Sequence, residues 1–264
     1  MCRLFWAMMF LMTSLSVSAQ SYGMIDNRAK AISWGQASDK QALVTHLTQN
    51  LTSDKNKARA LAVWIAFQMQ RDGYRHSVLI KASNQNRLAP EPIPNDPFVT
   101  RIGTSYDFAR LFQELATLAG LKAVVIDGFA GTDIQAFRYQ KPVYQAGETL
   151  YHIWTKTNHP LQRYQASWNA VEINGKWELL DTYYMIADTK LYGAETIRTD
   201  FAMTSFLNQR RQRHPSVRSL TSGKYIDNDY FLAKPRFFVK THFPLDSKWQ
   251  LLAVPLTWAS FINQ

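Results

Sequence analysis

The strongest constraint on the fold is a β-hairpin predicted in the second half of the chain. Residues 167–173 and 176–180 read as strands, and Asn174-Gly175 separates them. An Asn-Gly pair between two strand-like runs favours the two-residue hairpin turn, because both of its residues readily adopt the positive φ that the turn requires. The hairpin fixes an antiparallel sheet as one part of the fold.

Two amphipathic helices precede the hairpin. The first begins at Asn56 and is ended by Gly73, and the second covers about residues 105–119 and is ended by Gly120. In both, apolar side chains recur at helical spacing and form one face that packs into a core. A strand rich in Ala, Val and Ile is predicted over residues 121–129. Helices combined with an antiparallel sheet predict the α+β class.

Three segments carry the pattern of a known family: residues 103–108 at the start of the second helix, and residues 166–171 and 175–181 in the hairpin. They resemble the transglutaminase-like (papain-related) superfamily, whose members normally place a cysteine in the first segment, a histidine in the second and an aspartate in the third. The resemblance implies a papain-like core, in which the helix of the nucleophile position packs on an antiparallel sheet.

Two of these three catalytic positions are substituted. By resemblance, the cysteine position is Ser105, the histidine position is Ala166, and the aspartate is retained as Asp181. The family's chemistry is a relay in which a thiolate attacks a carbonyl, an imidazole moves the proton and a carboxylate orients the imidazole. Alanine cannot move a proton, and a serine hydroxyl is a poor nucleophile without an adjacent base. No catalytic set is therefore intact at these remnant positions.

Structural roles compete with chemical ones at the same positions. Ser105 falls at a helix start, where a serine oxygen commonly caps backbone N–H groups. Asp181 stands at a strand end, where an aspartate often makes a turn by accepting hydrogen bonds from its own backbone. His242, which precedes Phe243-Pro244, is predicted to be a structural histidine.

A polar and aromatic insertion over residues 130–164 holds two histidines, His152 and His159. Either is able to replace the missing imidazole if the insertion folds over the cleft that the family resemblance implies. No cofactor is predicted, and no metal site, because the six histidines show no metal-ligand spacing. The candidate ligand-binding residues are Tyr106, Trp168, His152 and Tyr74.

The C-terminal part of the chain carries a second match. Residues 229–235, 242–244 and 248–252 resemble the extension that follows the core in the kyphoscoliosis-peptidase branch of the superfamily. The two matches together cover roughly residues 55–262. The predicted organisation is a signal peptide (1–19), an N-terminal lead-in (20–56), a transglutaminase-like core (57–190) and a C-terminal extension packed on the core (191–264).

The first residues have the pattern of a secretory signal. Arg3 provides a positive start, residues 4–15 are apolar, and Val17-Ser18-Ala19 offers a cleavage site that leaves Gln20 as the mature N-terminus. The apolar stretch is shorter than the roughly 20 residues of a spanning helix, so the mature protein is not expected to be an integral membrane protein. Cys2, the only cysteine, leaves with the signal. A periplasmic or secreted protein without thiols is predicted.

The formal net charge of +10 is spread along the chain, with one cluster at Arg210, Arg211 and Arg213. A solvated surface explains this charge, and an anionic surface as partner is the sharper alternative. Nucleic acid is not an expected partner, because the chain shows no zinc-finger spacing and no RNA-binding aromatic motif.

Three functions remain open from the sequence. The first is an exported, catalytically inactive transglutaminase-like protein that binds a peptide, a protein or a glycan of the cell envelope. The second is a serine-based amidase, acyltransferase or peptidase that uses Ser105 with a relocated histidine. The third is a purely structural envelope protein. A histidine nitrogen within hydrogen-bond reach of Ser105 would favour the enzyme.

Overall fold

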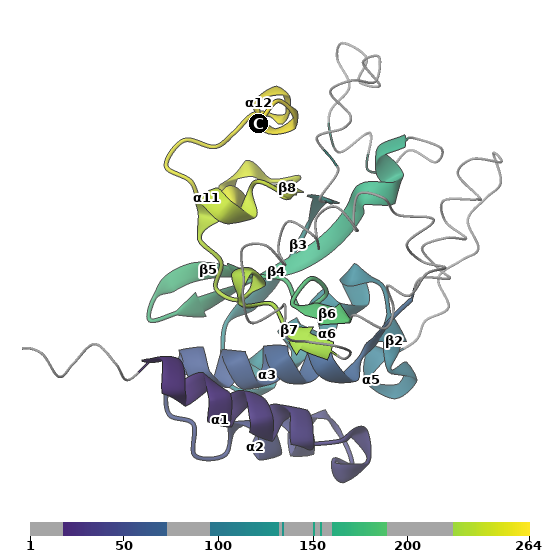
Figure 1. Ribbon diagram of the computed structural model, residues 1–264, viewed down its shortest axis with the longest axis vertical. Helices are drawn as coiled ribbons and strands as arrows, with labels where there is room; N and C mark the ends of the chain where they lie inside the picture. The colour runs from purple at the N-terminus through teal and green to yellow at the C-terminus, as the bar shows by residue number, and fades with distance from the viewer. Residues whose placement is uncertain are drawn as a thin grey trace, which may run out of the picture.

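The computed structural model describes residues 18–72, 96–131, 134, 150, 154, 160–188 and 224–264. Its described part is layered (Figure 1). An antiparallel sheet lies in the middle, with helices α6 (Ser105–Leu118) and α3 (Asp54–Gln68) below it in this view and α11 (Pro235–Phe238) and α12 (Trp258–Ile262) above it. The fold is α+β, as the sequence predicts.

The sheet contains β5 (Lys176–Leu180), β4 (Gln165–Ile173), β3 (Ala123–Ala130) and β8 (His242–Pro244), in that order, with antiparallel pairing throughout. The predicted hairpin is confirmed: Asn174 and Gly175 both have positive φ, at 50° and 76°. The C-terminal extension supplies the fourth strand, since β8 pairs with β3.

The helix predicted from Asn56 to Gly73 is α3, which begins earlier and ends earlier. Ser53 caps its start by accepting a hydrogen bond from the Asn56 N–H. The helix ends at Gln68 because the chain becomes extended at Met69 and enters β1 (Gln70–Arg71). This short strand pairs in parallel with β2 (Ile102–Gly103), which leads directly into α6.

The segment predicted as an N-terminal lead-in is helical and contributes to the core. Helix α1 (Ser18–Ala31) and helix α2 (Lys40–Thr48) pack on α3, and they bury Ile25 and Leu43 among other apolar side chains. Arg59 of α3 is fully buried and its guanidinium forms a two-bond ion pair with Asp26 of α1.

The rings of Tyr22 and Phe231 lie 4.9 Å from the Arg59 guanidinium carbon. Because Tyr22 belongs to α1 and Phe231 to the C-terminal extension, one buried cation connects the N-terminal helix to the extension.

The other short elements of the described chain are η1 (Trp34–Gln36), α5 (Pro97–Thr100), η3 (Pro160–Tyr164), β6 (Ile186–Asp188), β7 (Lys224–Ile226), η4 (Asn228–Tyr230) and η5 (Ser247–Gln250). Over the described residues, no helix is long and apolar enough to cross a membrane.

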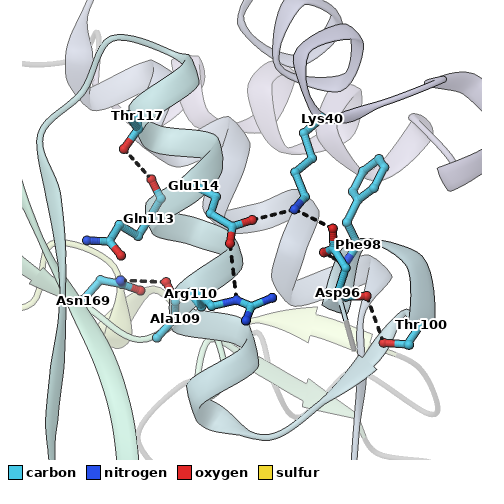
Figure 2. A network of polar contacts seen from close by, with 10 residues as sticks. All are labelled: Lys40, Asp96, Phe98, Thr100, Ala109, Arg110, Gln113, Glu114, Thr117 and Asn169. Carbon is cyan, nitrogen blue, oxygen red and sulfur yellow. Dashed lines mark hydrogen bonds and ion pairs between the residues drawn. The ribbon is translucent and has the colours of Figure 1, made fainter. Parts of the chain in front are cut away.

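Polar contacts hold α6 in place on two sides (Figure 2). Toward the sheet, the Asn169 amide donates to the carbonyl oxygens of Ala109, at 2.9 Å, and Val124, at 3.1 Å. On the other side, the Lys40 ammonium of α2 contacts Glu114 of α6 at 2.6 Å and Asp96 before α5 at 2.7 Å. These contacts hold α6 between the sheet and α2.

Candidate functional site

The start of α6 is set by a close backbone approach. The Asp107 carboxylate accepts hydrogen bonds from the Thr104 N–H and the Thr104 hydroxyl, at 2.8 and 3.0 Å, so Thr104 is the N-cap residue of the helix. A Cβ atom on Gly103 would lie 2.4 Å from the Asp107 Cβ. Only glycine leaves room for this turn, which places Ser105 in the first helical position.

Ser105 lies against β4. Its side-chain oxygen accepts a hydrogen bond from the Ser167 N–H at 3.2 Å, and the Ser167 nitrogen is bonded directly to Ala166. The predicted approach of the Ser105 and Ala166 positions is therefore confirmed. The structural role expected of Ser105, capping or packing, takes the form of packing: Thr104 and Asp107 satisfy the helix start, and the Ser105 oxygen binds the sheet.

Ala166 is the residue that the family resemblance assigns to the proton-transfer position. It lies on β4 directly opposite Gly128 of β3 and is buried. Because side chains alternate along a strand, Ala166 and Trp168 share one face of the sheet, which is the face that the C-terminal extension covers. A methyl group at this point has no capacity to accept or donate a proton.

Asp181 follows β5 immediately. Since Asn169 pairs with Leu180, the next residues along the two strands, Trp168 and Asp181, fall on the same face. One Asp181 carboxylate oxygen accepts hydrogen bonds from the N–H groups of Tyr183, at 2.7 Å, and Tyr184, at 2.9 Å. The predicted turn is thus confirmed.

The other Asp181 oxygen is held by a histidine from the C-terminal extension. Nε2 of His242 lies 3.0 Å from Oδ2 of Asp181, and Nδ1 of His242 lies 2.8 Å from the Thr241 hydroxyl. His242 is 0% exposed and Asp181 1%. Sequence reasoning identified His242 as structural but missed this partner, because 61 residues separate the two and no local pattern connects them.

Aromatic rings enclose the His242 imidazole. Phe238 stacks on it at 4.0 Å between ring centroids, and Trp168, Tyr184 and Tyr230 lie at 5.0, 5.2 and 5.8 Å. Burial raises the pKa of the Tyr184 phenol well above its usual value, and the neighbouring Tyr230 and Asp181 raise it further. The phenol therefore stays neutral and adds no charge to the pair.

Ser105 makes no hydrogen bond to an imidazole among the residues that the structure describes. Both ring nitrogens of His242 are engaged, and the other described histidine, His46, lies on α2, on the far side of α3 from the sheet (Figure 1). His152 and His159 lie outside the described residues. Around the described remnant positions, the chain presents a hydroxyl, a methyl group and a carboxylate that is already bonded.

A second polar contact near Ser105 was not predicted. The Ser167 hydroxyl, on the residue whose N–H binds Ser105, donates to the Asp127 carboxylate at 2.6 Å. Asp127 is exposed although it lies within β3. The start of α6 therefore has a carboxylate beside it that is open to solvent and able to accept further hydrogen bonds.

The predicted ligand-binding residues fall in different places. Tyr106 is 49% exposed beside Ser105, and Ile102 is also exposed on the strand that leads into α6. Trp168 is 1% exposed and packs on Phe238 and His242, so its ring presents no surface to a ligand. Tyr74 lies outside the described residues. Within the described ranges, no group of three His, Cys, Asp or Glu side chains is arranged to hold a metal ion.

The chain matches no protein-family model. It is 24% identical to human kyphoscoliosis peptidase over 250 residues, which cover 95% of this chain and 30% of that protein. Hillarin of Drosophila melanogaster is 27% identical over 225 residues, with 84% and 22% covered, and the Lim and transglutaminase domain protein ltd-1 of Caenorhabditis elegans is 25% identical over 223 residues, with 83% and 24% covered.

The chain thus spans less than a third of the length of these curated relatives. A solved crystal structure of a TGase aligns with 65% of this chain and 34% of its own, with a TM-score of 0.35 and 11% identity. The relatives match the chain across the same segments that carry the Ser105, Ala166 and Asp181 positions. These similarities support a transglutaminase-like, kyphoscoliosis-peptidase-like family for the chain.

Proposed function

We propose that this protein is an exported, catalytically inactive transglutaminase-like protein that binds an extended peptide, a segment of a protein or an envelope glycan. One observation carries the loss of catalysis. The proton-transfer position is Ala166, and the imidazole nearest to Asp181 has both ring nitrogens bonded within the protein. General acid–base participation contributes on the order of 10²–10⁴-fold to such reactions, and no described imidazole is bonded to Ser105 to provide it.

The binding surface is the area around the start of α6. Tyr106 and Ile102 offer apolar contact, while Asp127 and the half-buried Ser105 offer polar atoms beside them. An exposed ring next to hydrogen-bond acceptors suits a ligand that carries both apolar groups and N–H or O–H donors. Peptides and glycans both have this chemistry.

Export rests on the sequence at the N-terminus, where a positive residue, a short apolar stretch and a small-residue cleavage site follow one another. The net charge of +10 favours an anionic envelope surface as an additional partner. N-terminal sequencing of the mature protein tests the export step. Gln20 is the expected first residue, and a dominant cytosolic species that still starts at Met1 would contradict export.

The catalytic half of the proposal is tested with purified protein and two substrate classes, acyl-donor glutamine peptides and envelope-derived peptides. We expect turnover equal to the background without enzyme. The matched control is Ser105→Ala, which removes the hydroxyl and with it the hydrogen bond from the Ser167 N–H. Turnover by the parent protein that disappears in Ser105→Ala would replace the binding function with a serine enzyme that uses a relocated histidine.

A further inference from the structure

The Asp181 carboxylate already binds three donors, and the one lone-pair position left is on Oδ2. Two backbone N–H groups occupy Oδ1, and the His242 imidazole occupies Oδ2. The backbone of Asp181 is held as well, because its N–H donates to the Tyr230 carbonyl at 3.0 Å. Both Tyr230 and His242 belong to the C-terminal extension. The extension therefore binds the one retained catalytic residue by its main chain and by its side chain.

The position of Ala166 is close enough to compete for the same carboxylate. Trp168 and Asp181 are in register on neighbouring strands, and residue 166 is the next position along β4 on that face. Diagonal neighbours of this kind have Cβ atoms roughly 7–8 Å apart, which an imidazole side chain can span. An imidazole at residue 166 and the His242 imidazole would thus seek the same oxygen.

We propose that His242 acts as a positioning residue that retains Asp181 for the C-terminal extension and excludes an imidazole at residue 166 from it. This inference deepens the proposed loss of catalysis and rests on it. The site has not only lost two side chains. Its remaining carboxylate has been reassigned to a contact between the core and the extension, so replacing the two lost side chains does not rebuild the relay.

The hydrogen-bond geometry makes this contact durable. The Thr241 hydroxyl lies 2.8 Å from Nδ1 of His242 and 3.5 Å from the Phe238 carbonyl oxygen. Both ring nitrogens of His242 therefore have a partner, the Thr241 hydroxyl at Nδ1 and the Asp181 carboxylate at Nε2.

The test measures the reactivity of a thiol placed at the nucleophile position. A thiol at a helix start beside an imidazole is alkylated rapidly at mildly acidic pH, because the imidazolium stabilises the thiolate. Iodoacetamide is the probe, and the rate is followed against pH by peptide mapping, which separates the introduced thiol from Cys2. The comparison begins with S105C and with S105C/A166H. We expect the same pH profile for both, because Asp181 does not orient the new imidazole.

Two substitutions of His242 complete the experiment. Asparagine places its amide where Nδ1 lies and keeps the contact with Thr241, but it is too short to reach Asp181; glutamine places its amide where Nε2 lies and keeps the bond to Asp181. In S105C/A166H/H242N we expect alkylation at about pH 6 to rise about tenfold or more. In S105C/A166H/H242Q we expect no rise.

An acidic shift already present in S105C/A166H would overturn the proposal, and so would a folded S105C/A166H/H242N protein without the rise. If that variant does not fold, the single variant A166H decides. Its His242 ring-nitrogen resonances are expected at their parent positions, and a displacement would overturn the exclusion. Turnover by the unmodified protein would instead contradict the proposed function. It would not change the alkylation and resonance results expected for these variants.

Discussion

Two polar clusters flank α6 and the sheet, and they use similar groups in different surroundings. On the Trp168 face, Asp181 and His242 lie 3.0 Å apart with exposures of 1% and 0%. On the outer side of α6, Lys40 contacts Asp96 and Glu114 at 2.7 and 2.6 Å, with side-chain exposures of 23%, 40% and 34% (Figure 2). Judged by distance alone, the outer cluster would be expected to contribute more to stability than the buried pair.

Exposure to solvent reverses this order, so that breaking the buried pair costs more stability than breaking the outer one. Water competes for each charge of the outer cluster and solvates whichever group loses its partner, so such ion pairs contribute little. Inside the protein an abandoned carboxylate finds no water, and removal of one partner costs several kcal/mol. The buried pair therefore permits a single arrangement, whereas the outer network tolerates substitution.

The largest effect is expected from Asp181→Ala. This change leaves the Tyr183 and Tyr184 N–H groups and the His242 imidazole without their acceptor inside the protein. We expect the free energy of unfolding, measured by urea titration, to fall by about 3–5 kcal/mol. Asp181→Asn is the control, since its amide keeps one acceptor oxygen and should lose less. A change for Asp181→Ala within the range of a surface substitution would break the comparison.

Gly128→Ala tests how closely the buried face is packed. An added Cβ would lie 2.3 Å from the Phe243 carbonyl oxygen and 2.5 Å from the Trp168 ring, and neither the strand nor the enclosed ring is free to move. We expect a loss of about 3 kcal/mol in unfolding free energy. Gly23→Ala in α1 is the matched control. It meets no atom within 4 Å and should stabilise the protein by roughly 0.5–1 kcal/mol.

Lys40→Met tests the outer cluster and should cost about 1 kcal/mol near neutral pH. Burial raises the pKa of Asp96, but the Lys40 bond and the Phe98 N–H lower it more, so the net pKa is depressed. Burial lowers the pKa of Lys40, and the bonds to Asp96 and Glu114 outweigh it, so the net pKa is raised.

The directions of the Asp96 and Lys40 pKa shifts define the pH range over which Lys40→Met should cost stability. A depressed carboxyl pKa contributes stability above its ordinary value of about 4, and this stability is lost as the pH falls through the depressed pKa. A raised ammonium pKa contributes stability below about 10.4, lost as the pH rises through the raised pKa. The cost of Lys40→Met should therefore be complete between these limits and fade outside them. Lys122→Met, which removes the exposed Lys122–Glu172 pair, should show no comparable window.

The smallest stability effect is expected from Tyr106→Ala, within about 0.5 kcal/mol, because the ring is half exposed. Its effect on binding should be larger, since the ring belongs to the proposed ligand surface. Binding of envelope-derived peptides and purified envelope glycan is measured for this variant and for Leu118→Ala, an exposed apolar residue at the other end of α6. Equal retention of binding by both variants would remove the start of α6 as the ligand surface.

Part of the fold could be predicted from the sequence because it depends on interactions between neighbouring residues. The Asn174-Gly175 turn, the stop at Gly120 and the apolar stripe of α6 depend on neighbouring residues only, and all three appear as predicted. The helix α3 was extended too far, because its end at Gln68 is imposed by pairing between β1 and β2, a contact with residues more than 30 positions away.

The candidate site divides in the same way. The sequence, through its family resemblance, assigned the nucleophile and proton-transfer positions to Ser105 and Ala166, and this assignment needs no knowledge of the packing. It also indicated the turn at Asp181, which is made with the next residues along the chain. Only the tertiary structure decided that His242 takes the second carboxylate oxygen and that the Ser105 hydroxyl binds the Ser167 N–H. Both contacts join segments about 60 residues apart, and their geometry follows from how the sheet and the C-terminal extension pack, which no local pattern encodes.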